Sequence, residues 1–325
     1  MIRPRRNRQS AAVRGLVRES RLAAGQFILP LFVTEGEVDE PIESMPGCVR
    51  WSVGGLVREA EAAWAVGVRA VVLFPRIAEG LKTRGAEEAW NAAGLVPRAV
   101  QALRAALPGL AVITDVALDP YNRDGHDGLV SDEGEILNDE TVVALCAQAV
   151  CHARAGATMV APSDMMDGRV GALRTALDGA GFPGVSIMSY TAKYASACYG
   201  PFRGALDSAP KSGDKKTYQM DPANGREAVR EALLDEAEGA DILMVKPAGF
   251  YLDIIYRVKA ETVLPVAAYQ VSGEYLMIKA ACAGGWLDER KVVMESLTAI
   301  HRAGADLILT YFAKQAAVWL AEGEE

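Results

Sequence analysis

Eight short apolar runs alternate with segments of helical periodicity, and this alternation constrains the fold more than any other feature of the chain. The apolar runs lie at residues 28–33, 70–74, 111–116, 158–161, 185–190, 241–245, 265–270 and 307–310. The clearest amphipathic segments lie at residues 55–66, 95–106, 140–153, 170–180, 225–238, 251–259 and 289–302. Strict alternation of strand and helix implies parallel pairing through right-handed crossovers. Eight such units predict an α/β fold of the (β/α)8 TIM-barrel type. An open doubly wound sheet is the alternative, but no glycine-rich fingerprint follows the first strand.

The composition is compatible with one large domain. The chain has 325 residues, half of them hydrophobic, and barrels commonly have this length. No apolar stretch is long enough to span a bilayer, and no apolar leader follows the basic N-terminus, so we expect a cytoplasmic protein without a membrane partner. The five cysteines are scattered and lack a C-x-x-C pair, which argues against a disulfide framework and against a cysteine zinc site.

The N-terminal segment differs in charge from the rest of the chain. Residues 1–21 contain seven arginines and one acid, Glu19, although the whole chain carries a formal charge of -8. A basic arm can bind nucleic acid, but this one lacks interleaved aromatic residues and joins an acidic body. We therefore expect residues 1–24 to lie on an acidic surface of a neighbouring subunit in a homo-oligomer, with no nucleic-acid partner. Residues 25–325 are then a single catalytic barrel.

Polar residues interrupt or follow the apolar runs at the ends of separate strands. They are Asp115, Asp119, Ser163, Asp164, Lys193, Lys246, Ser272 and Tyr311. Active sites of (β/α)8 barrels lie at the C-terminal ends of the strands. Because these residues come from several different units, we expect them to share one site.

Two of these residues are lysines that follow apolar runs. Lys246 belongs to DILMVKPA (241–248), and Lys193 follows the run at 185–190 among tyrosines. Burial lowers the pKa of an amine, and a neutral amine can attack a ketone. A single strand-end lysine more often extends its charge into solvent, but a second lysine in the same setting favours imine chemistry.

Residues 197–222 form the longest stretch without clear periodicity. The stretch is rich in glycine and proline and contains the cations Arg203, Lys211, Lys215 and Lys216. A long loop in a compact barrel is usually functional or disordered. Because it follows Lys193 and offers cations to an anionic substrate, we predict an active-site lid; a solvated surface loop is the alternative.

Eight longer strings carry a more specific signal. They are TDVALDPY (114–121), GHDG (125–128), VAPSDMMDGR (160–169), SYTAKYASACYGPFR (189–203), KKTYQMDPAN (215–224), MVKPA (244–248), AYQVSGEY (268–275) and ILTYFAK (308–314). In this order they resemble the porphobilinogen synthase (5-aminolevulinate dehydratase) family. The resemblance implies a (β/α)8 barrel with an N-terminal arm, usually a homo-octamer. It also implies a lyase that condenses two molecules of 5-aminolevulinate asymmetrically, with loss of two waters, to form porphobilinogen for haem and other tetrapyrroles.

The resemblance implies roles for the residues near the reacting atoms. Lys246 forms a Schiff base with the substrate in the P site, and Lys193 forms one with the substrate in the A site. Asp115 and Ser163 lie around the reacting amines. Asp115 is the third catalytic candidate, because it can hold an ammonium or relay a proton; an aspartate after a strand is otherwise most often a cap.

The resemblance also implies residues that bind the substrates. Arg203, Lys215 and Gln219 on the lid match the A-site carboxylate clamp, and Ser272 and Tyr311 match the P-site clamp. The apolar walls are Tyr194, Tyr199 and Phe202.

The chain departs from the zinc-dependent members of the family, which have three cysteines after the third strand. The matching positions hold Ala117, Asp119 and Asp127, and carboxylates favour hard cations over zinc. We therefore expect no catalytic zinc. The sequence leaves open whether the two aspartates bind Mg2+, bind a monovalent ion or contact the substrate amine.

A second metal is implied by the many bacterial relatives that carry an allosteric Mg2+. The matching residue is Glu231, in the predicted helix at 225–238. Mg2+ retains several waters and needs only one or two protein carboxylates. Most helical glutamates are instead solvated acids, here paired with Arg230 or Lys216. We expect Mg2+ at Glu231 as an allosteric cofactor.

Three other functions account for part of the pattern. A class I aldolase explains Lys246 but uses one imine-forming lysine and a sugar-phosphate site. A metal-dependent barrel hydrolase would use Asp119, His126 and Asp127, although the chain has only three histidines. A non-catalytic scaffold is supported only by the basic arm and the expected oligomer.

Overall fold

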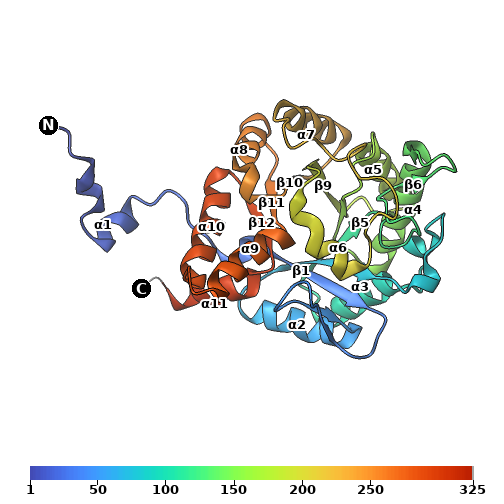
Figure 1. Cartoon of the computed structure of the whole chain (residues 1–325), viewed down its shortest axis with the longest axis horizontal. Coiled ribbons are helices and arrows are strands. Elements are labelled where there is room, and N and C mark those ends of the chain that lie inside the picture. The colour runs from blue at the N-terminus through green and yellow to red at the C-terminus, as the bar shows by residue number, and fades with distance from the viewer. Residues whose placement is uncertain (324–325) are drawn as a thin grey trace.

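The computed structural model describes residues 1–323 and contains the closed barrel that the sequence predicts (Figure 1). The barrel strands are β1 (Phe27–Thr34), β4 (Ala70–Arg76), β5 (Ala111–Val116), β8 (Met159–Pro162), β9 (Ser186–Lys193), β10 (Ile242–Lys246), β11 (Val266–Gln270) and β12 (Leu307–Thr310). Each strand pairs in parallel with its neighbours, and β12 closes the barrel against β1, where Phe27 lies opposite Ile308. The (β/α)8 prediction is confirmed.

Helices surround the barrel and connect its strands (Figure 1). The predicted ones are α2 (Val53–Ala65), α3 (Leu95–Ala106), α4 (Asn138–Ala155), α5 (Arg169–Gly179), α7 (Arg226–Glu238), α8 (Leu252–Glu261) and α10 (Glu289–Ala303). Further helices are α1 (Ala11–Leu16), α6 (Gly200–Leu206), α9 (Ser272–Ala283) and α11 (Ala313–Glu322). Asp288 caps α10 as expected for such a residue, because its carboxylate accepts the backbone N–H of Lys291.

Short elements decorate the connections. The 3-10 helices are η1 (Pro4–Arg8), η2 (Ala24–Gln26), η3 (Glu79–Leu81), η4 (Glu87–Trp90), η5 (Ala197–Tyr199) and η6 (Gly249–Tyr251). The short strands are β2 (Glu40–Pro41), β3 (Val49–Trp51), β6 (Leu129–Val130) and β7 (Ile136–Leu137). β3 extends the sheet beyond β1, and β6 pairs with β7 as a separate hairpin.

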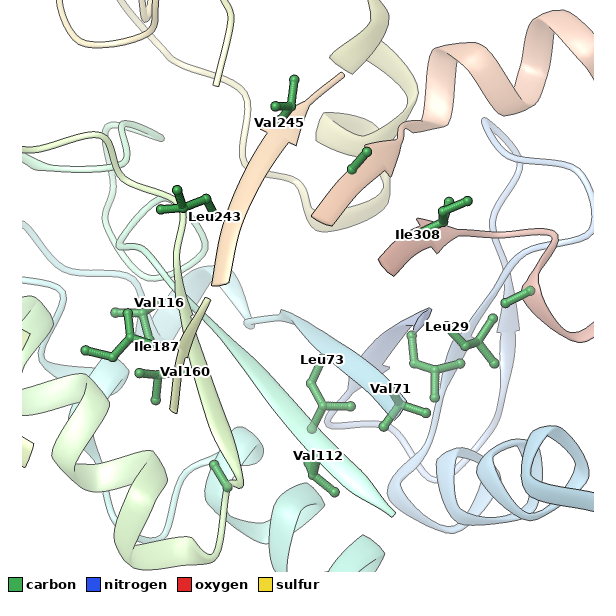
Figure 2. Close-up of a cluster of buried hydrophobic side chains, with 14 of the residues drawn as sticks. Leu29, Val71, Leu73, Val112, Val116, Val160, Ile187, Leu243, Val245 and Ile308 are labelled. Carbon is green, nitrogen blue, oxygen red and sulfur yellow. The ribbon is translucent and has the colours of Figure 1, made fainter. Parts of the chain in front are cut away.

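Apolar side chains pack on both faces of the barrel sheet. Figure 2 shows Leu29, Val71 and Ile187 in the cluster that the strands share with the surrounding helices. Their sequence neighbours Ile28 and Val72 belong to a second buried cluster. Successive side chains of a strand point to opposite faces, so this second cluster fills the barrel interior. Because apolar side chains occupy both faces of the sheet, the polar site residues lie at the strand ends.

The N-terminal arm contributes little to the barrel core. η1 and α1 contain no buried residue, and Leu16 is 82% exposed. Figure 1 shows this segment extending away from the barrel. An exposed apolar residue on a basic arm is suited to contact with a neighbouring subunit. That contact stays a prediction. None of the helices within residues 1–323 is long and apolar enough to cross a membrane.

The predicted lid at 197–222 begins with η5 and α6 and ends where Met220 bridges to Tyr194. Side chains from β3 and from the end of β4 hold it in place. Arg50 donates to the carbonyl of Ala205 at 2.6 Å, and Arg76 pairs with Asp207 at 2.7 Å. The segment therefore lies against the C-terminal ends of the strands, where the sequence places the site.

Candidate active site

The two candidate lysines end neighbouring strands in register. Lys193 is the last residue of β9 and Lys246 the last of β10, and the two are paired across the parallel ladder. Both side chains are almost completely buried. Parallel strands that end together bring their terminal side chains to the same edge of the barrel. One site can therefore offer two amines.

Lys246 Nζ is surrounded by aromatic rings. It lies 5.0–5.2 Å from the ring centroids of four residues, Tyr190, Tyr199, Phe202 and Tyr269. No carboxylate within residues 1–323 forms an ion pair with it. Burial, together with the nearby charge of Lys193, lowers the pKa of Lys246 to about 7. A substantial fraction of this amine is therefore neutral near pH 7, as a nucleophile requires.

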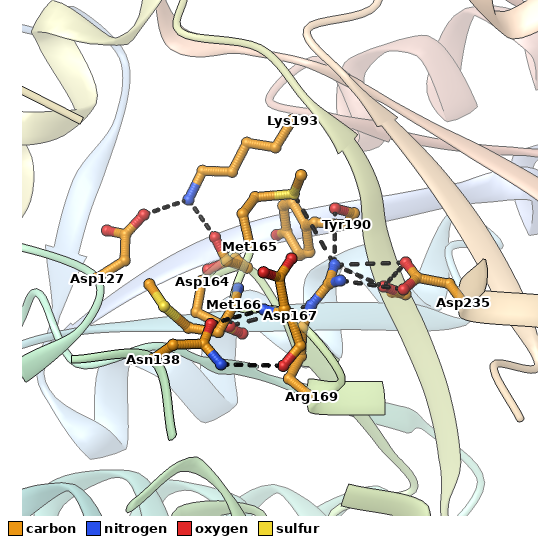
Figure 3. Close-up of polar contacts among 12 residues, drawn as sticks. Asp127, Asn138, Asp164, Met165, Met166, Asp167, Arg169, Tyr190, Lys193 and Asp235 are labelled. Atoms are coloured by element: carbon orange, nitrogen blue, oxygen red, sulfur yellow. Dashed lines mark hydrogen bonds and ion pairs between the residues drawn. The ribbon is translucent and has the colours of Figure 1, made fainter. Parts of the chain in front are cut away.

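Lys193 has a contrasting, polar environment (Figure 3). Its Nζ donates to Asp127 Oδ2 at 2.8 Å and to the backbone carbonyl of Ser163. An ammonium in such a buried ion pair cannot act as a nucleophile until the pair is broken. The two lysines thus present one free amine and one paired amine.

Asp127 links Lys193 to the lid segment. Its Oδ1 accepts from Lys215 Nζ at 2.6 Å, and Gln219 Nε2 donates to its Oδ2 at 3.4 Å. Lys215 also lies 3.5 Å from Asp119. Although burial opposes ionisation, the charges of Lys193 and Lys215 hold the pKa of Asp127 below its usual range. The sequence left open whether Asp127, in the GHDG string, binds an ion or the substrate amine, and it did not anticipate these lysine contacts.

Asp115 is the second carboxylate with a changed pKa. Burial and the neighbouring charge of Asp119 raise the pKa of Asp115 to about 7, against the opposing charges of Lys246 and Lys193. One of its oxygens, Oδ1, has no hydrogen-bond partner. A carboxyl group that titrates near pH 7 beside an amine that also titrates there can exchange protons with it.

These groups line one small cavity. The cavity has a volume of about 30 Å3. Its lining residues are Phe74, Asp115, Asp119, Asp127, Ser163, Lys193, Tyr199, Phe202, Arg203, Lys215, Gln219 and Lys246. Ten of the predicted site residues are among them; Phe74 and Asp127 are the additions. The space approximates that of a single water molecule, so a substrate can enter only if the lining segments move.

Ser272 and Tyr311 are not among the residues that line this cavity, but each contacts a residue whose ring lies near Lys246. Ser272 Oγ accepts the backbone N–H of Phe202 at 3.1 Å, and so touches the lid segment. The hydroxyls of Tyr311 and Tyr269 are 2.9 Å apart. The Tyr269 ring is one of those around Lys246, so both predicted P-site residues lie on the Lys246 side.

Tyr194 is not among the residues that line the cavity. Its ring stacks on Tyr251 with centroids 4.2 Å apart, and its hydroxyl donates to the carbonyl of Asn224. Side chains alternate along the chain at a strand end, so the residue after Lys193 faces the surrounding helices. The structure therefore places Tyr194 behind the site, where it supports β9.

A buried ionic network lies beside the cavity and was not anticipated from the sequence (Figure 3). Arg169 pairs with Asp235 of α7 at 3.0 Å and also donates to Ser189 Oγ and to the carbonyl of Tyr190. Only the arginine in the MMDGR string pointed to it. The network fixes α7 against β9, three residues before Lys193.

Glu231 lies apart from the cavity, on the outer part of α7. It lines a separate cavity of about 600 Å3 together with Asp167, Glu227 and Glu135. Lys216 pairs instead with Asp214, and no ion pair joins Glu231 to Arg230. Burial, and then the neighbouring carboxylates, raise the pKa of Glu231, with Arg169 opposing. Residues 1–323 contain no preformed cluster of three histidine, cysteine or acidic ligands.

A family model for delta-aminolevulinic acid dehydratase matches residues 1–319 of the chain. Curated relatives match over nearly the whole chain. The chloroplastic delta-aminolevulinic acid dehydratase of Physcomitrium patens is 62% identical over 320 residues, which cover 98% of this chain and 74% of the relative. Dehydratase 1 of Arabidopsis thaliana, also chloroplastic, is 61% identical over 320 residues with the same coverage of both chains.

The names of these relatives contradict the expected cytoplasmic location. The relatives from Physcomitrium patens, Selaginella martensii, Arabidopsis thaliana and Chlamydomonas reinhardtii are all chloroplastic proteins. The expectation rested on finding neither a bilayer-spanning stretch nor an apolar signal segment in the sequence. The absence of one kind of targeting segment does not determine a compartment, so the inference was wrong.

A solved structure agrees with the fold and with the family. The delta-aminolevulinic acid dehydratase (porphobilinogen synthase) of Toxoplasma gondii ME49, in complex with the reaction product porphobilinogen, superimposes with a TM-score of 0.98. It is 52% identical, and the match covers 99% of this chain and 92% of that one. The chain therefore belongs to the delta-aminolevulinic acid dehydratase family, the porphobilinogen synthases of tetrapyrrole biosynthesis.

Proposed function

We propose that Lys246 and Lys193 carry the porphobilinogen synthase reaction by forming imines with two molecules of 5-aminolevulinate. The observation that supports this most is the register pairing of the two lysines in opposite electrostatic environments. Two identical substrates must react asymmetrically. A free amine beside aromatic rings and an amine paired with a carboxylate distinguish the two substrate positions before either substrate binds.

Lys246 has the chemistry of the first nucleophile. Its neutral amine attacks the ketone carbon of one substrate, the resulting carbinolamine loses one water, and the imine nitrogen is left protonated. The aromatic rings around Nζ exclude water, which would otherwise hydrolyse the imine. Asp115, with a pKa of about 7, supplies and accepts protons in these steps.

Lys193 becomes a nucleophile only after its ion pair with Asp127 is broken. The amino group of the A-site substrate is itself an ammonium and can replace Lys193 beside Asp127. This exchange keeps the buried carboxylate paired, which avoids the cost of an isolated buried charge. Substrate binding would thereby free the amine that the second imine requires.

The two carboxylate clamps differ in chemistry. Arg203 and Lys215 offer cations from the lid, so closing the lid would be coupled to binding of the A-site carboxylate. Ser272 and Tyr311 offer neutral hydroxyls to the P-site carboxylate. Neutral donors suffice where the site is preorganised, since a hydrogen bond to a charged group is stronger than one between neutral groups.

The donor set argues against a catalytic zinc ion. Ala117 has no ligating atom, and Asp127 is already bound to two ammonium groups. The carboxylates in this region thus balance lysine charges. We propose a zinc-independent enzyme in which Asp119 and Asp127 contact amines.

Glu231 fits a different ion. The cavity around it contains further carboxylates, and their repulsion raises its pKa together with burial. A hydrated dication would offset that repulsion and needs only one or two direct carboxylate ligands. We propose that Mg2+ binds here, with Glu231 as the central ligand and Asp167 and Glu227 beside it.

The same acidic cavity is a suitable surface for the arm of a neighbouring subunit. The arm carries seven arginines in residues 1–21, and the cavity is lined by four acids, Glu135, Asp167, Glu227 and Glu231. Opposite charges of this kind favour association of the two surfaces. We propose a homo-oligomer, with the octamer as the expected form, in which arms contact neighbouring barrels.

The lysine roles are tested by reductive trapping. Enzyme mixed with 5-aminolevulinate is treated with borohydride, which reduces an imine to a stable amine, and the modified lysines are located by peptide mass analysis. We expect substrate adducts on Lys246 and Lys193. An adduct on one lysine only would point to the single imine of an aldolase, and product formation without either adduct would refute both roles.

The metal assignments are tested separately. Porphobilinogen formation is measured in chelator-treated enzyme to which Mg2+ or Zn2+ is returned. We expect activity that Zn2+ does not increase and that Mg2+ raises. A requirement for Zn2+ would refute the zinc-independent assignment, and indifference to Mg2+ would remove the proposed ion at Glu231.

A further inference from the structure

The N-terminus of α9 contacts two parts of the active site. Ser272 holds the lid segment through the backbone N–H of Phe202. Gly273 lies so close to Cys198 that a Cβ atom there would be 2.6 Å from the Cys198 carbonyl oxygen. Glu274, the next residue, reaches in another direction, to the backbone that follows Lys246. Three consecutive residues thus contact the lid and the segment that follows Lys246.

The carboxylate of Glu274 binds two separate backbone segments. Its Oε2 accepts the N–H of Val271 at 2.7 Å, which is an ordinary cap at the start of a helix. Its Oε1 accepts the N–H of Gly249 at 2.5 Å, three residues after Lys246. A cap needs only the first of these contacts. The second ties η6, which follows β10 closely, to the start of α9.

Burial of the Glu274 carboxylate is energetically unfavourable. Glu274 is 5% exposed, and no cation within residues 1–323 forms an ion pair with it. Burial raises the pKa of Glu274 to about 7, and its backbone hydrogen bonds, including one with Ala248, oppose that rise. A buried carboxylate without a cation persists when several N–H groups hold it. Its geometry is therefore fixed by the backbone segments that it joins.

We propose that Glu274 is a positioning residue for imine formation at Lys246. By holding residues 248–249 against the start of α9, it sets the distance between the Lys246 amine and the Ser272 hydroxyl, which binds the carboxylate of the same substrate. A ketone and a carboxylate on one short molecule must meet both groups at once. Small displacements between such groups reduce rates strongly. This inference rests on the proposed roles of Lys246 and Ser272.

The test uses Glu274→Gln and a keto acid that lacks the amino group, 4-oxopentanoate. This probe can form an imine but cannot complete the condensation. Glutamine keeps the length of the side chain, but its amide N–H2 would face one backbone N–H and lose that contact. We expect the rate of borohydride-trapped adduct at Lys246 to fall about tenfold or more. Any adduct at Lys193 in the same sample should change by less than about twofold. That change is well below the tenfold loss expected where a reacting group is misplaced.

A second variant disturbs the same contact from its other side. At Gly249, an added Cβ would lie 2.5 Å from Glu274 Oε1, so Gly249→Ala displaces the carboxylate while keeping its charge. We expect the same selective loss at Lys246, and in the double variant a loss smaller than the product of the two single losses. The matched control is Glu289→Gln, which removes the surface ion pair between α10 and Lys279 of α9. It should leave both adducts unchanged.

The outcomes distinguish a failure of the Glu274 inference from a failure of the proposed role of Lys246. Equal losses at Lys246 and Lys193, or a lower unfolding temperature with unchanged trapping, would show that Glu274 is only a helix cap and overturn the inference. If Glu274→Gln does not fold, Gly249→Ala alone decides. The absence of any Lys246 adduct in the unmodified enzyme would instead refute the proposed role of Lys246, and this inference with it.

Discussion

Asp127 Oδ2 lies 2.8 Å from Lys193 Nζ, and both side chains are almost completely buried. The other oxygen of the same carboxylate binds Lys215 of the lid. One aspartate therefore holds both the amine that we propose forms the second imine and a cation of the lid segment. The substrate brings an ammonium, which can take the place of Lys193 beside Asp127, and a carboxylate, which can take the place of Asp127 beside Lys215.

This relationship predicts that Asp127→Asn impairs folding stability and activity together. The substitution leaves two buried ammonium groups without their shared counter-ion. Loss of one partner of a buried ion pair typically costs about 3–5 kcal/mol. We expect a loss of about 3 kcal/mol in the free energy of unfolding, measured by urea denaturation, and a fall in kcat/KM of at least about a hundredfold.

The matched control for this variant is Asp132→Asn. Asp132 pairs with Arg84 on the surface, where both side chains are more than half exposed. Exposed pairs contribute about 0–1 kcal/mol, so the control should retain stability and activity. An Asp127→Asn enzyme as active as the control would mean that Asp127 has no part in holding the amines.

The pKa of Lys246 predicts a pH dependence with a defined sign. The neutral fraction of its amine increases as pH rises through about 7, so imine formation should rise over the same interval. Burial and the charge of Lys193 both lower this pKa. In Lys193→Met the neighbouring like charge is absent and Asp127 loses a partner. Both changes raise the pKa of Lys246, and the pH midpoint should move upward.

The measurement for this prediction is the rate of borohydride trapping of 4-oxopentanoate at Lys246 from pH 5 to pH 10, a range that spans the lowered and the ordinary pKa of a lysine. Lys216→Met is the control, since Lys216 is a lid lysine whose side chain is 75% exposed. Its midpoint should stay that of the unmodified enzyme. A midpoint that moves downward in Lys193→Met would contradict the assignment of electrostatic coupling between the two lysines.

The barrel could be predicted because its pattern is local and repeated. The strand at 111–116 and the helix at 95–106 have the predicted bounds, since each is a short apolar or amphipathic segment bounded by breakers. α9 and α11 follow from the eight-unit pattern, but their bounds were not predicted. Both are rich in small apolar residues and follow directly on strand-end motifs, so their periodicity is weak. α6 begins with Gly200 and Pro201, residues typical of loops.

The site could be predicted only as a set of residues, not as a network of contacts. Strand ends bring Lys193 and Lys246 together, and this follows from the fold. The partner of each lysine depends on loops whose conformation is not encoded in a periodic pattern. Asp127 lies in such a loop, and Tyr194 was assigned to the wall although strand alternation turns it outward. Sequence proximity to a catalytic residue does not fix which face a side chain occupies.

The proposed P-site clamp predicts a selective effect of Tyr311→Phe. The variant removes one neutral donor to a carboxylate and the 2.9 Å hydrogen bond with Tyr269, while the ring remains. A hydrogen bond to a charged group contributes about 1.5–3 kcal/mol. We expect KM for 5-aminolevulinate to rise at least about tenfold with a smaller change in kcat, measured by steady-state kinetics.

The control is Tyr256→Phe, which alters a residue 67% exposed on α8 and should have no effect. A fall in kcat at unchanged KM would place Tyr311 in the chemistry and not in substrate binding.

The proposed Mg2+ site at Glu231 predicts that the Glu231→Gln enzyme no longer responds to Mg2+. Glu231→Gln removes the central carboxylate of the acidic cavity but lies outside the cavity that contains the lysines, so activity in chelator-treated enzyme should be retained. The ratio of activity with Mg2+ to activity without it should fall to near unity. Titration calorimetry should show loss of the binding heat for Mg2+, which is a readout independent of turnover. Glu295→Gln on the exposed face of α10 is the control and should keep both responses. Mg2+ stimulation that survives in Glu231→Gln would place the ion elsewhere, with Asp167 and Glu227 the next residues to substitute.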